Sequence, residues 1–141
     1  MTPEALVAAA AEARARAYSP YSRFAVGAAI ETQSGRVYTG CNVENVSYGL
    51  AVCAERTAAF AAVCAGERAW RALAVVTEDG SPPCGPCRQV LAEFAGSSLP
   101  IYLATPDGTY RRSTLGELFP EPFSSPRVRR SRHRTRGIPC A

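Results

Sequence analysis

Cysteine residues with the spacing of a redox or metal site occur in "SPPCGPCRQ", residues 81–89. The pair Cys84 and Cys87 fits either a thioredoxin-type dithiol couple or half of a zinc site. A redox couple would follow an early strand and usually has a Trp just before its first Cys. Here the pair lies past the middle of the chain and the single tryptophan, Trp70, lies well upstream of it. This context disfavours the redox interpretation.

A zinc site needs more ligands than this pair, four in a structural site and three in a catalytic site that keeps one position for water. The chain has one histidine, His133, and it lies in the C-terminal segment. Cys53 in "CAER" is the better third ligand, since a thiolate at a helix N-terminus is stabilised by free amides and the helix dipole. We expect Cys53, Cys84 and Cys87 to hold one zinc ion.

Glu55 follows Cys53 by two residues. This position is poor for a fourth ligand but close enough to reach a water at the open metal position, where a carboxylate can transfer protons. A His or Cys, a Glu two residues later and a distant Pro-Cys-x-x-Cys form the signature of zinc deaminases. We therefore expect Glu55 to be the catalytic acid and base.

The segments around these residues alternate between helical and strand patterns, which predicts an α/β fold with helices layered on a mixed sheet. Thr2 and Pro3 mark the start of the first helix, and a Ser-Gly turn joins the first two strands into a hairpin. The expected helices span 3–18, 53–67 and 85–96, and the expected strands span 24–32, 37–45, 71–79, 99–105 and 109–114.

Four blocks resemble the small homotetrameric cytidine deaminases that have a three-cysteine zinc site. They are "PYSRFAVGAA" at 20–29, "GCNVENVSYG" at 40–49, "CAERTA" at 53–58 and "PCGPCRQVL" at 83–91. The resemblance runs from about Ala5 to Phe123. It implies a three-layer α/β/α sandwich on a five-stranded mixed sheet, one zinc ion per subunit, and hydrolytic deamination of cytidine and 2′-deoxycytidine in pyrimidine salvage.

Asn42 and Glu44 are the candidates for sugar recognition. Strand alternation places them on one face with Val43 on the other, and an amide beside a carboxylate can bind a hydroxyl group. The resemblance implies that they hold the ribose and that Phe24 packs on the pyrimidine ring. The alternatives are that "NVEN" is a polar strand end and that Phe24 is a core residue.

Arg56 is the candidate for balancing the charge of the three thiolates. A guanidinium that donates hydrogen bonds to thiolates withdraws electron density from them, which restores the pull of zinc on its water. The resemblance implies the same role, and the alternative is an ordinary surface arginine on the helix.

The resemblance adds three substrate-binding residues, Ala54, Tyr48 and Phe123. Tyr48 and Phe123 match residues that reach into a neighbouring subunit's active site. This implies a homotetramer with shared sites that binds a small-molecule nucleoside.

The remaining cysteines have no expected role in the chemistry. Cys41 alternates away from Asn42 and Cys64 lies among alanines, so we expect both to be small buried residues. Cys140 lies in the C-terminal segment.

Charge is unevenly distributed along the 141 residues. Residues 1–126 carry ten Arg against twelve Asp and Glu and form the expected deaminase domain, whereas 127–141 carry six Arg and no acid. A same-sign block of this kind predicts a disordered, solvated tail, although a nucleic-acid-binding arm stays open. No segment has the pattern of a secretion signal or a membrane helix, so we expect a cytoplasmic protein with no membrane partner.

Three other functions remain open. Blasticidin-S-type deaminases share the size and the Pro-Cys-x-x-Cys block, but "PYSRFAVGAA" and "NVEN" look more like nucleoside enzymes. Deaminases of nucleotides or tRNA need basic residues near the pocket, and residues 1–126 offer no cluster beyond Arg111-Arg112. A noncatalytic zinc-binding module would explain the cysteines but not Glu55, Asn42 and Glu44.

Overall fold

A five-stranded sheet lies at the centre of the computed structural model, which describes residues 1–125. The strand order is β2-β1-β3-β4-β5. β3 and β4 run parallel, and the other neighbours run antiparallel. The strands are β1 (Gly27–Thr32), β2 (Val37–Cys41), β3 (Trp70–Val76), β4 (Pro100–Ala104) and β5 (Tyr110–Thr114).

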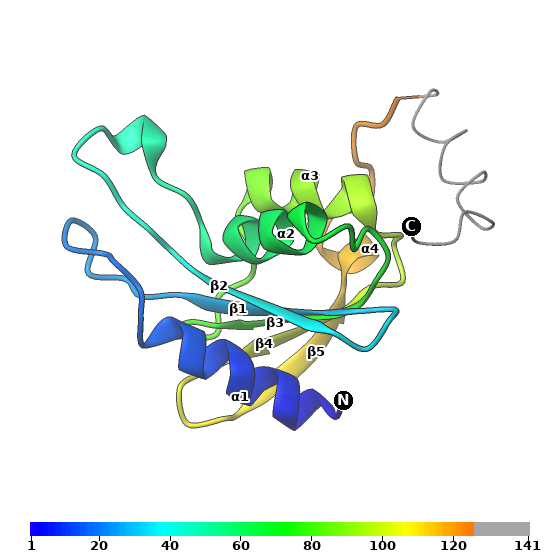
Figure 1. Ribbon diagram of the computed structural model, residues 1–141, viewed down its shortest axis with the longest axis horizontal. Coiled ribbons are helices and arrows are strands. Elements are labelled where there is room, and N and C mark those ends of the chain that lie inside the picture. Colours follow the sequence, from blue (N-terminus) through cyan, green and yellow to red (C-terminus); the bar gives the residue numbers. More distant parts are fainter. Residues whose placement is uncertain (126–141) are drawn as a thin grey trace.

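Helices cover both faces of this sheet (Figure 1). α1 (Pro3–Arg14) lies on one face, and α2 (Ala54–Cys64), α3 (Gly85–Phe94) and α4 (Leu115–Leu118) lie on the other. β3 is buried on both sides: Ala72 and Ala74 pack in the cluster under α1, while Leu73 and Val75 pack in the cluster under α2 and α3. The predicted three-layer α/β/α sandwich on a five-stranded mixed sheet is confirmed.

The first helix begins as predicted and ends earlier. Thr2 caps α1 by accepting a hydrogen bond from the Ala5 backbone N–H, but the helix stops at Arg14 rather than at Tyr18. The backbone N–H of Tyr18 donates instead to the carbonyl of Asn42, 3.0 Å away, and its carbonyl accepts from Glu44. Pairing with the segment after β2 therefore replaces the last helical turn.

The first two strands are also shorter than the sequence pattern predicts. β1 begins at Gly27, so Phe24 lies in the loop before it, and β2 ends at Cys41. Residues 42–52 leave the sheet as an arm that contains a short 3₁₀ turn, η1 (Tyr48–Leu50), and Figure 1 shows this arm projecting away from the sheet. Asn42 and Glu44 therefore lie beyond the strand that was expected to carry them.

The Arg-rich segment 127–141 and Cys140 lie outside the described residues. Within residues 1–125, no helix combines the length and the apolar character needed to cross a membrane.

Candidate active site

Two helix N-termini on one face of the sheet bring the three predicted cysteines together. Cys53 is the N-cap residue of α2 and Cys84 that of α3, while Cys87 lies in the first turn of α3. The sulfur atoms of Cys84 and Cys87 are 3.3 Å apart, those of Cys53 and Cys84 are 3.7 Å apart, and all three lie within 4.8 Å of one another. Both helices thus place their free backbone amides beside the sulfur cluster.

The donor set fits zinc. Two sulfurs that each lie about 2.3 Å from a tetrahedral ion are about 3.8 Å apart, close to the two separations above. A disulfide would require about 2.05 Å, and all five cysteines within residues 1–125 are free thiols. Three thiolates also leave one vertex of the tetrahedron for a water molecule.

Cys53 is the sulfur whose thiolate form is most strongly favoured. The pKa of Cys53 is lowered to about 5, chiefly through its hydrogen bond with Cys87, and the guanidinium of Arg56 acts in the same direction. A thiolate is the form that binds metal. The site is therefore already arranged for a charged sulfur ligand.

Glu55 lies in the first turn of α2 and is only 5% exposed to solvent. The Cys87 thiol lies 3.7 Å from its Oε2 as a hydrogen-bond donor. Burial raises the pKa of the Glu55 carboxyl above its ordinary value, and the charge on Cys53 adds to the shift. A carboxyl with a raised pKa holds a proton more readily than an exposed one, which suits a group that both accepts and releases protons.

Arg56 lies against the sulfurs. Its Nη2 donates to the Sγ of Cys53 over 3.3 Å. Its Nε is buried and, within residues 1–125, has no hydrogen-bond partner. A buried N–H group without a hydrogen-bond partner destabilises the folded protein. The negative charge of the neighbouring thiolates reduces this destabilisation.

Asn42 and Glu44 both face the loop that precedes β1. The Asn42 side chain accepts from the Val26 backbone N–H at 2.9 Å and donates to the Phe24 carbonyl at 2.7 Å. It therefore fixes the backbone on both sides of Ala25 and keeps one amide hydrogen free for a ligand. Phe24 is partly buried and packs against the core cluster under α2 and α3.

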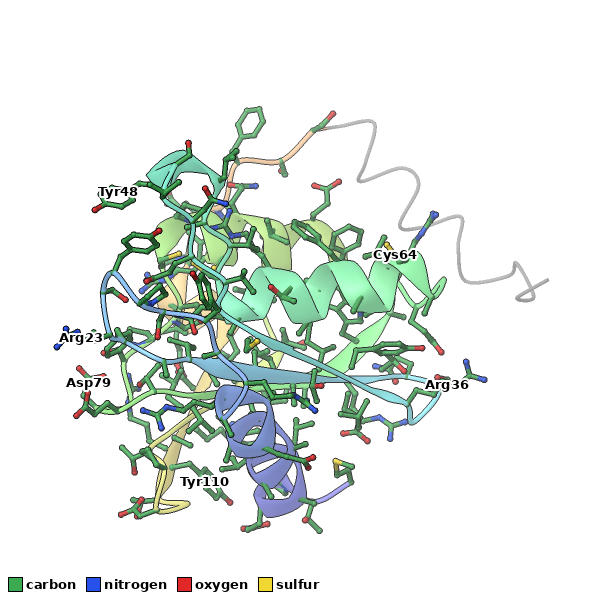
Figure 2. The ribbon with its side chains drawn as sticks, turned by 60° about the vertical axis from the view of Figure 1, so that its left-hand side comes forward. Arg23, Arg36, Tyr48, Cys64, Asp79 and Tyr110 are labelled. Carbon is green, nitrogen blue, oxygen red and sulfur yellow. The ribbon has the colours of Figure 1, made fainter. Side chains whose placement is uncertain are left out.

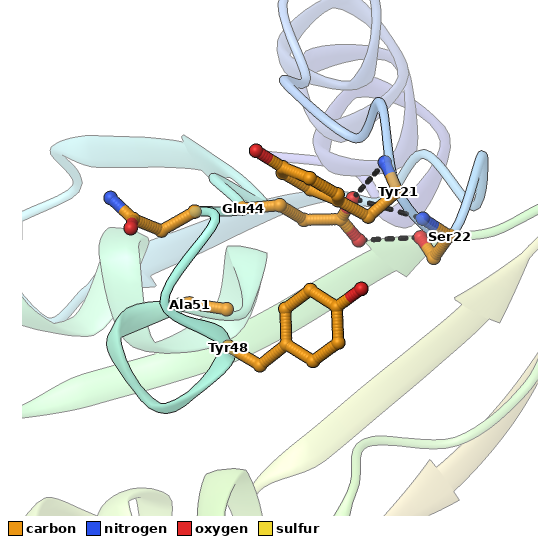
Figure 3. A pocket seen from close by; sticks show the side chains of 6 residues that line it. Tyr21, Ser22, Glu44, Tyr48 and Ala51 are labelled. Atoms are coloured by element: carbon orange, nitrogen blue, oxygen red, sulfur yellow. Dashed lines mark hydrogen bonds between the residues drawn. The ribbon is translucent and has the colours of Figure 1, made fainter.

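A pocket of about 340 Å³ opens beside Glu44 and is shown in Figure 3. Its lining comprises Tyr21, Ser22, Glu44, Asn45, Tyr48 and Ala51. The cysteines are not among these residues, so this pocket lies beside Glu44 and does not include the sulfur cluster. Ala54, the first residue of α2, is fully buried next to Cys53.

The two residues expected to serve a neighbouring subunit are the most exposed of the candidates. Tyr48 is 76% exposed and Phe123 is 83% exposed. The Tyr48 ring makes an edge contact with Tyr21, with ring centres 5.7 Å apart, and it projects at the outer edge of the molecule in Figure 2. Phe123 lies after α4 and is absent from the Glu44 pocket. The structure thus brings Cys53, Cys84, Cys87, Glu55 and Arg56 together and leaves Phe123 outside that group.

Sequence reasoning missed two sets of supporting residues. Tyr21 and Ser22 donate hydrogen bonds to the Glu44 carboxylate. Both lie inside "PYSRFAVGAA", but the residue pattern of that block does not predict a turn that directs them toward residue 44. Arg88 donates from Nε to the Pro83 carbonyl and from Nη1 to the Leu118 carbonyl, at 2.8 and 2.6 Å. Arg88 thus joins the loop before Cys84 to α4. In the sequence, the only indication of this role is that Arg88 directly follows Cys87.

The expectation that Cys41 and Cys64 are buried was wrong. Cys64 is exposed at the end of α2, where the helix leaves the sheet, and Cys41 is only partly buried. The Sγ of Cys41 lies 3.5 Å from the carbonyl of Arg16, because the chain after α1 runs alongside the end of β2.

Known proteins resemble this chain over most of its length. The family model described as the cytidine and deoxycytidylate deaminase zinc-binding region matches residues 1–103. A cytidine deaminase of Sporosarcina psychrophila is 48% identical over 126 residues, which cover 88% of this chain and 93% of that protein. A cytidine deaminase of Mycobacterium tuberculosis is 52% identical over 126 residues, covering 86% of this chain and 91% of the relative.

Solved structures agree with the sequence comparison. The crystal structure of cytidine deaminase from Burkholderia pseudomallei superposes with a TM-score of 0.83 at 50% identity, covering 87% of this chain and all of that one (100%). The structure of cytidine deaminase from Mycobacterium leprae gives a TM-score of 0.75 at 42% identity, covering 86% and 99%. With the sulfur cluster and the fold described above, these matches show that the chain belongs to the cytidine deaminase family.

Proposed function

We propose that the protein catalyses hydrolytic deamination of cytidine and 2′-deoxycytidine, which yields uridine or 2′-deoxyuridine and ammonia. The observation that carries this function is the convergence of three sulfurs within 4.8 Å at two helix N-termini, with the buried Glu55 two residues after Cys53. Zinc is the cofactor that fits this donor set, and Cys53, Cys84 and Cys87 are its proposed ligands.

When bound, the zinc ion supplies a Lewis acid that acidifies water for attack on the carbon bearing the amino group. Glu55 accepts one proton from the attacking water and delivers it to the ring nitrogen; it then accepts the remaining proton of the hydroxyl that is now bonded to carbon and passes it to the amino group, which leaves as ammonia. Burial keeps its pKa above the ordinary value, so the carboxyl can take both roles. Arg56 offsets the thiolate charge through its hydrogen bond to Cys53.

The nucleoside is held by residues between the sulfur cluster and the arm. We assign the ribose to Asn42 and Glu44, the pyrimidine ring to Phe24, and a further contact with the base to Ala54 at the N-terminus of α2. The support is geometric: Asn42 fixes the Phe24 backbone, and Glu44 lines the 340 Å³ pocket. A pocket of this size is in the range that binds small molecules.

The discriminating experiment is an absorbance assay with cytidine, 2′-deoxycytidine and blasticidin S as substrates. We expect turnover of both pyrimidine nucleosides and none of blasticidin S. Turnover of blasticidin S alone would show that the protein is a blasticidin-S-type deaminase instead. Absence of turnover for all three substrates by the zinc-loaded protein would favour a noncatalytic zinc-binding module.

We infer that the active enzyme is a homotetramer with shared sites. Val46, Tyr48 and Leu50 on the arm are 80%, 76% and 67% exposed, and Phe123 is 83% exposed. Exposed apolar side chains that follow one another along the arm mark a surface that another chain covers. A second copy of the chain would bury the arm and bring Tyr48 and Phe123 to a neighbour's pocket.

The proposed compartment is the cytoplasm, since reducing conditions keep the three ligand cysteines as free thiols. The domain boundary at residue 126 and the solvated character of 127–141 also remain proposals. Deleting 127–141 should leave cytidine turnover unchanged and should not alter retention of RNA or DNA at physiological salt. Lower retention after deletion would make the segment a nucleic-acid-binding arm.

A further inference from the structure

The carboxylate of Glu44 is held by the loop that precedes β1. Its Oε1 accepts hydrogen bonds from the backbone N–H groups of Tyr21 and Ser22, at 3.0 and 3.1 Å. Its Oε2 accepts from the Ser22 hydroxyl at 2.5 Å. Figure 3 shows all three bonds converging from one side, with the Tyr48 ring on the other side of the pocket.

The Ser22 hydroxyl has a second partner, because it also accepts the backbone N–H of Phe24 at 3.1 Å. A hydroxyl has one hydrogen to donate and lone pairs to accept, so one side chain joins Glu44 to the backbone of Phe24. These are the residues assigned above to the ribose and to the pyrimidine ring. Ser22 therefore connects the two halves of nucleoside recognition.

The loop conformation is shaped for this connection. Arg23, between Ser22 and Phe24, has φ 57°, and it is the one residue other than glycine with a positive φ within residues 1–125. This left-handed conformation is unfavourable for an arginine, and such residues gather at functional sites where the surroundings hold them. The turn lets the hydroxyl of Ser22 reach Glu44 and the N–H of Phe24 together.

The Glu44 side chain lies beyond the end of β2, so no strand ladder orients it. The backbone there is joined to its neighbours through single bridges at Val43. A carboxylate has about four lone-pair positions, and the three bonds leave one on Oε2 for a ligand. The bond from Ser22 also lowers the pKa of Glu44, so the carboxylate stays an acceptor.

We propose that Ser22 is a positioning residue for nucleoside binding, which fixes the orientation of the Glu44 carboxylate toward a sugar hydroxyl and fixes the backbone of Phe24 beside it. This role rests on the proposed function of the site. It assigns Ser22 to substrate affinity rather than to the chemical step, since its hydroxyl is already bonded to protein groups on both sides.

The test compares Ser22→Ala with wild type on cytidine and on 2′,3′-dideoxycytidine, which lacks the 2′ and 3′ hydroxyls and keeps the 5′ hydroxyl. A hydrogen bond to a charged group is strong enough that its loss should raise KM for cytidine about tenfold, with kcat within about twofold. The loss on the dideoxy substrate should be clearly smaller, because that substrate lacks the 2′ and 3′ hydroxyls and keeps only the effect that acts through Phe24. Ser34→Ala is the matched control, since Ser34 also donates to a glutamate, Glu67, at 2.6 Å in the distant β1–β2 turn; its kinetics should equal those of wild type.

The isosteric pair Ser22→Thr and Ser22→Val keeps the test decisive if Ser22→Ala fails to fold. Thr retains the hydroxyl and should keep KM near the wild-type value, whereas Val should raise it. An unchanged KM for cytidine in the Ala or Val variant overturns the positioning role, and so does an equal loss on both substrates. In either case the wild-type protein would still deaminate cytidine, so the proposed function would be unaffected. If the wild-type protein does not deaminate cytidine, both the proposed function and the role of Ser22 are wrong.

Discussion

Glu55 and Cys87 meet in a buried corner between the first turns of α2 and α3. A carboxyl in this environment holds its proton more tightly than one in water, because the charged form loses solvation. The same corner contains the sulfur atoms proposed to bind zinc. Proton transfer and metal binding thus depend on separate atoms that are only a few ångströms apart, so a substitution can remove one function and spare the other.

Glu55→Gln should abolish most of the turnover while the protein stays folded and keeps its zinc. The amide is nearly the same size but cannot carry the proton, and loss of a general acid and base costs about 10²–10⁴-fold in rate. Steady-state kinetics with cytidine and metal analysis by mass spectrometry measure the two effects. The control is Glu31→Gln, which changes a buried carboxylate paired with Arg71 away from the site; it should keep kcat. Near-normal deamination by Glu55→Gln contradicts the assignment.

Arg56→Ala should keep zinc and lower kcat by about tenfold, the effect of losing roughly 1.4 kcal/mol of interaction. The guanidinium hydrogen-bonds Cys53, so its removal leaves the full thiolate charge on the metal site. Arg71→Ala removes a guanidinium from the β1–β3 region instead and should leave kcat unchanged. An Arg56→Ala enzyme as fast as wild type would make Arg56 an ordinary helix residue.

Helix α2 carries Cys53, Ala54, Glu55 and Arg56, so its distance from the sheet sets the position of the site. The helix lies very close to β2 at Gly40. A Cβ atom added there would lie 2.5 Å from the Ala58 backbone nitrogen and 2.7 Å from the Ala54 carbonyl. The absence of a side chain at Gly40 is what allows this close packing.

Gly40→Ala should therefore lower the free energy of unfolding by about 3 kcal/mol, as overpacking does, and should reduce kcat because α2 must move. Gly96→Ala is the control, since a Cβ there meets no atom within 4 Å, and its effect on stability should stay within about 0.5 kcal/mol. Denaturant unfolding of the zinc-loaded proteins provides the comparison. Equal stability of the two variants would refute the close-packing argument.

The sequence predicts the helix starts well, because Cys53, Cys84 and the glycines and prolines near them are local signals. The zinc-ligand grouping follows from those starts. Helix α1 and strands β1 and β2 were predicted too long. Pairing of Tyr18 with residues 42–44 competes with the local pattern at the ends of α1 and β2, and the Asn42 side chain bonds the backbone of Phe24 and Val26 before β1. The contacts of Ser22 with Glu44 depend on a left-handed turn at Arg23. No residue pattern around Arg23 predicts this turn, because an arginine does not favour a positive φ.

In the whole molecule, the side chains proposed to complete the sites lie on its outside. The arm, residues 42–52, lies outside the sheet, and the segment after α4 is joined to α3 by the bond from Gln89 Nε2 to the Phe123 carbonyl at 3.1 Å. Figure 2 places Tyr48 far from Arg36 at the β1–β2 turn, and the arm carries exposed large apolar side chains, among them Val46, Tyr48 and Leu50. Assembly through the arm would connect subunit contacts directly to substrate binding.

Leu50→Glu should shift the protein from tetramers to smaller species and lower turnover in parallel, because a buried unpaired charge opposes association. Light scattering gives the mass and the cytidine assay gives the rate. Arg36→Glu, an exposed charge change at the β1–β2 turn, should affect neither. A wild type that is active as a monomer would contradict the shared-site proposal while leaving the chemistry of each chain intact.

Every role proposed for the site requires that Cys53, Cys84 and Cys87 bind one zinc ion with a fourth position left for water. X-ray absorption at the zinc edge of the purified protein measures this directly. We predict one zinc per chain with three sulfur neighbours at about 2.3 Å and one lighter atom at about 2.0–2.1 Å. Four sulfur neighbours, none at all, or a bonded Cys84–Cys87 pair without zinc would contradict the account.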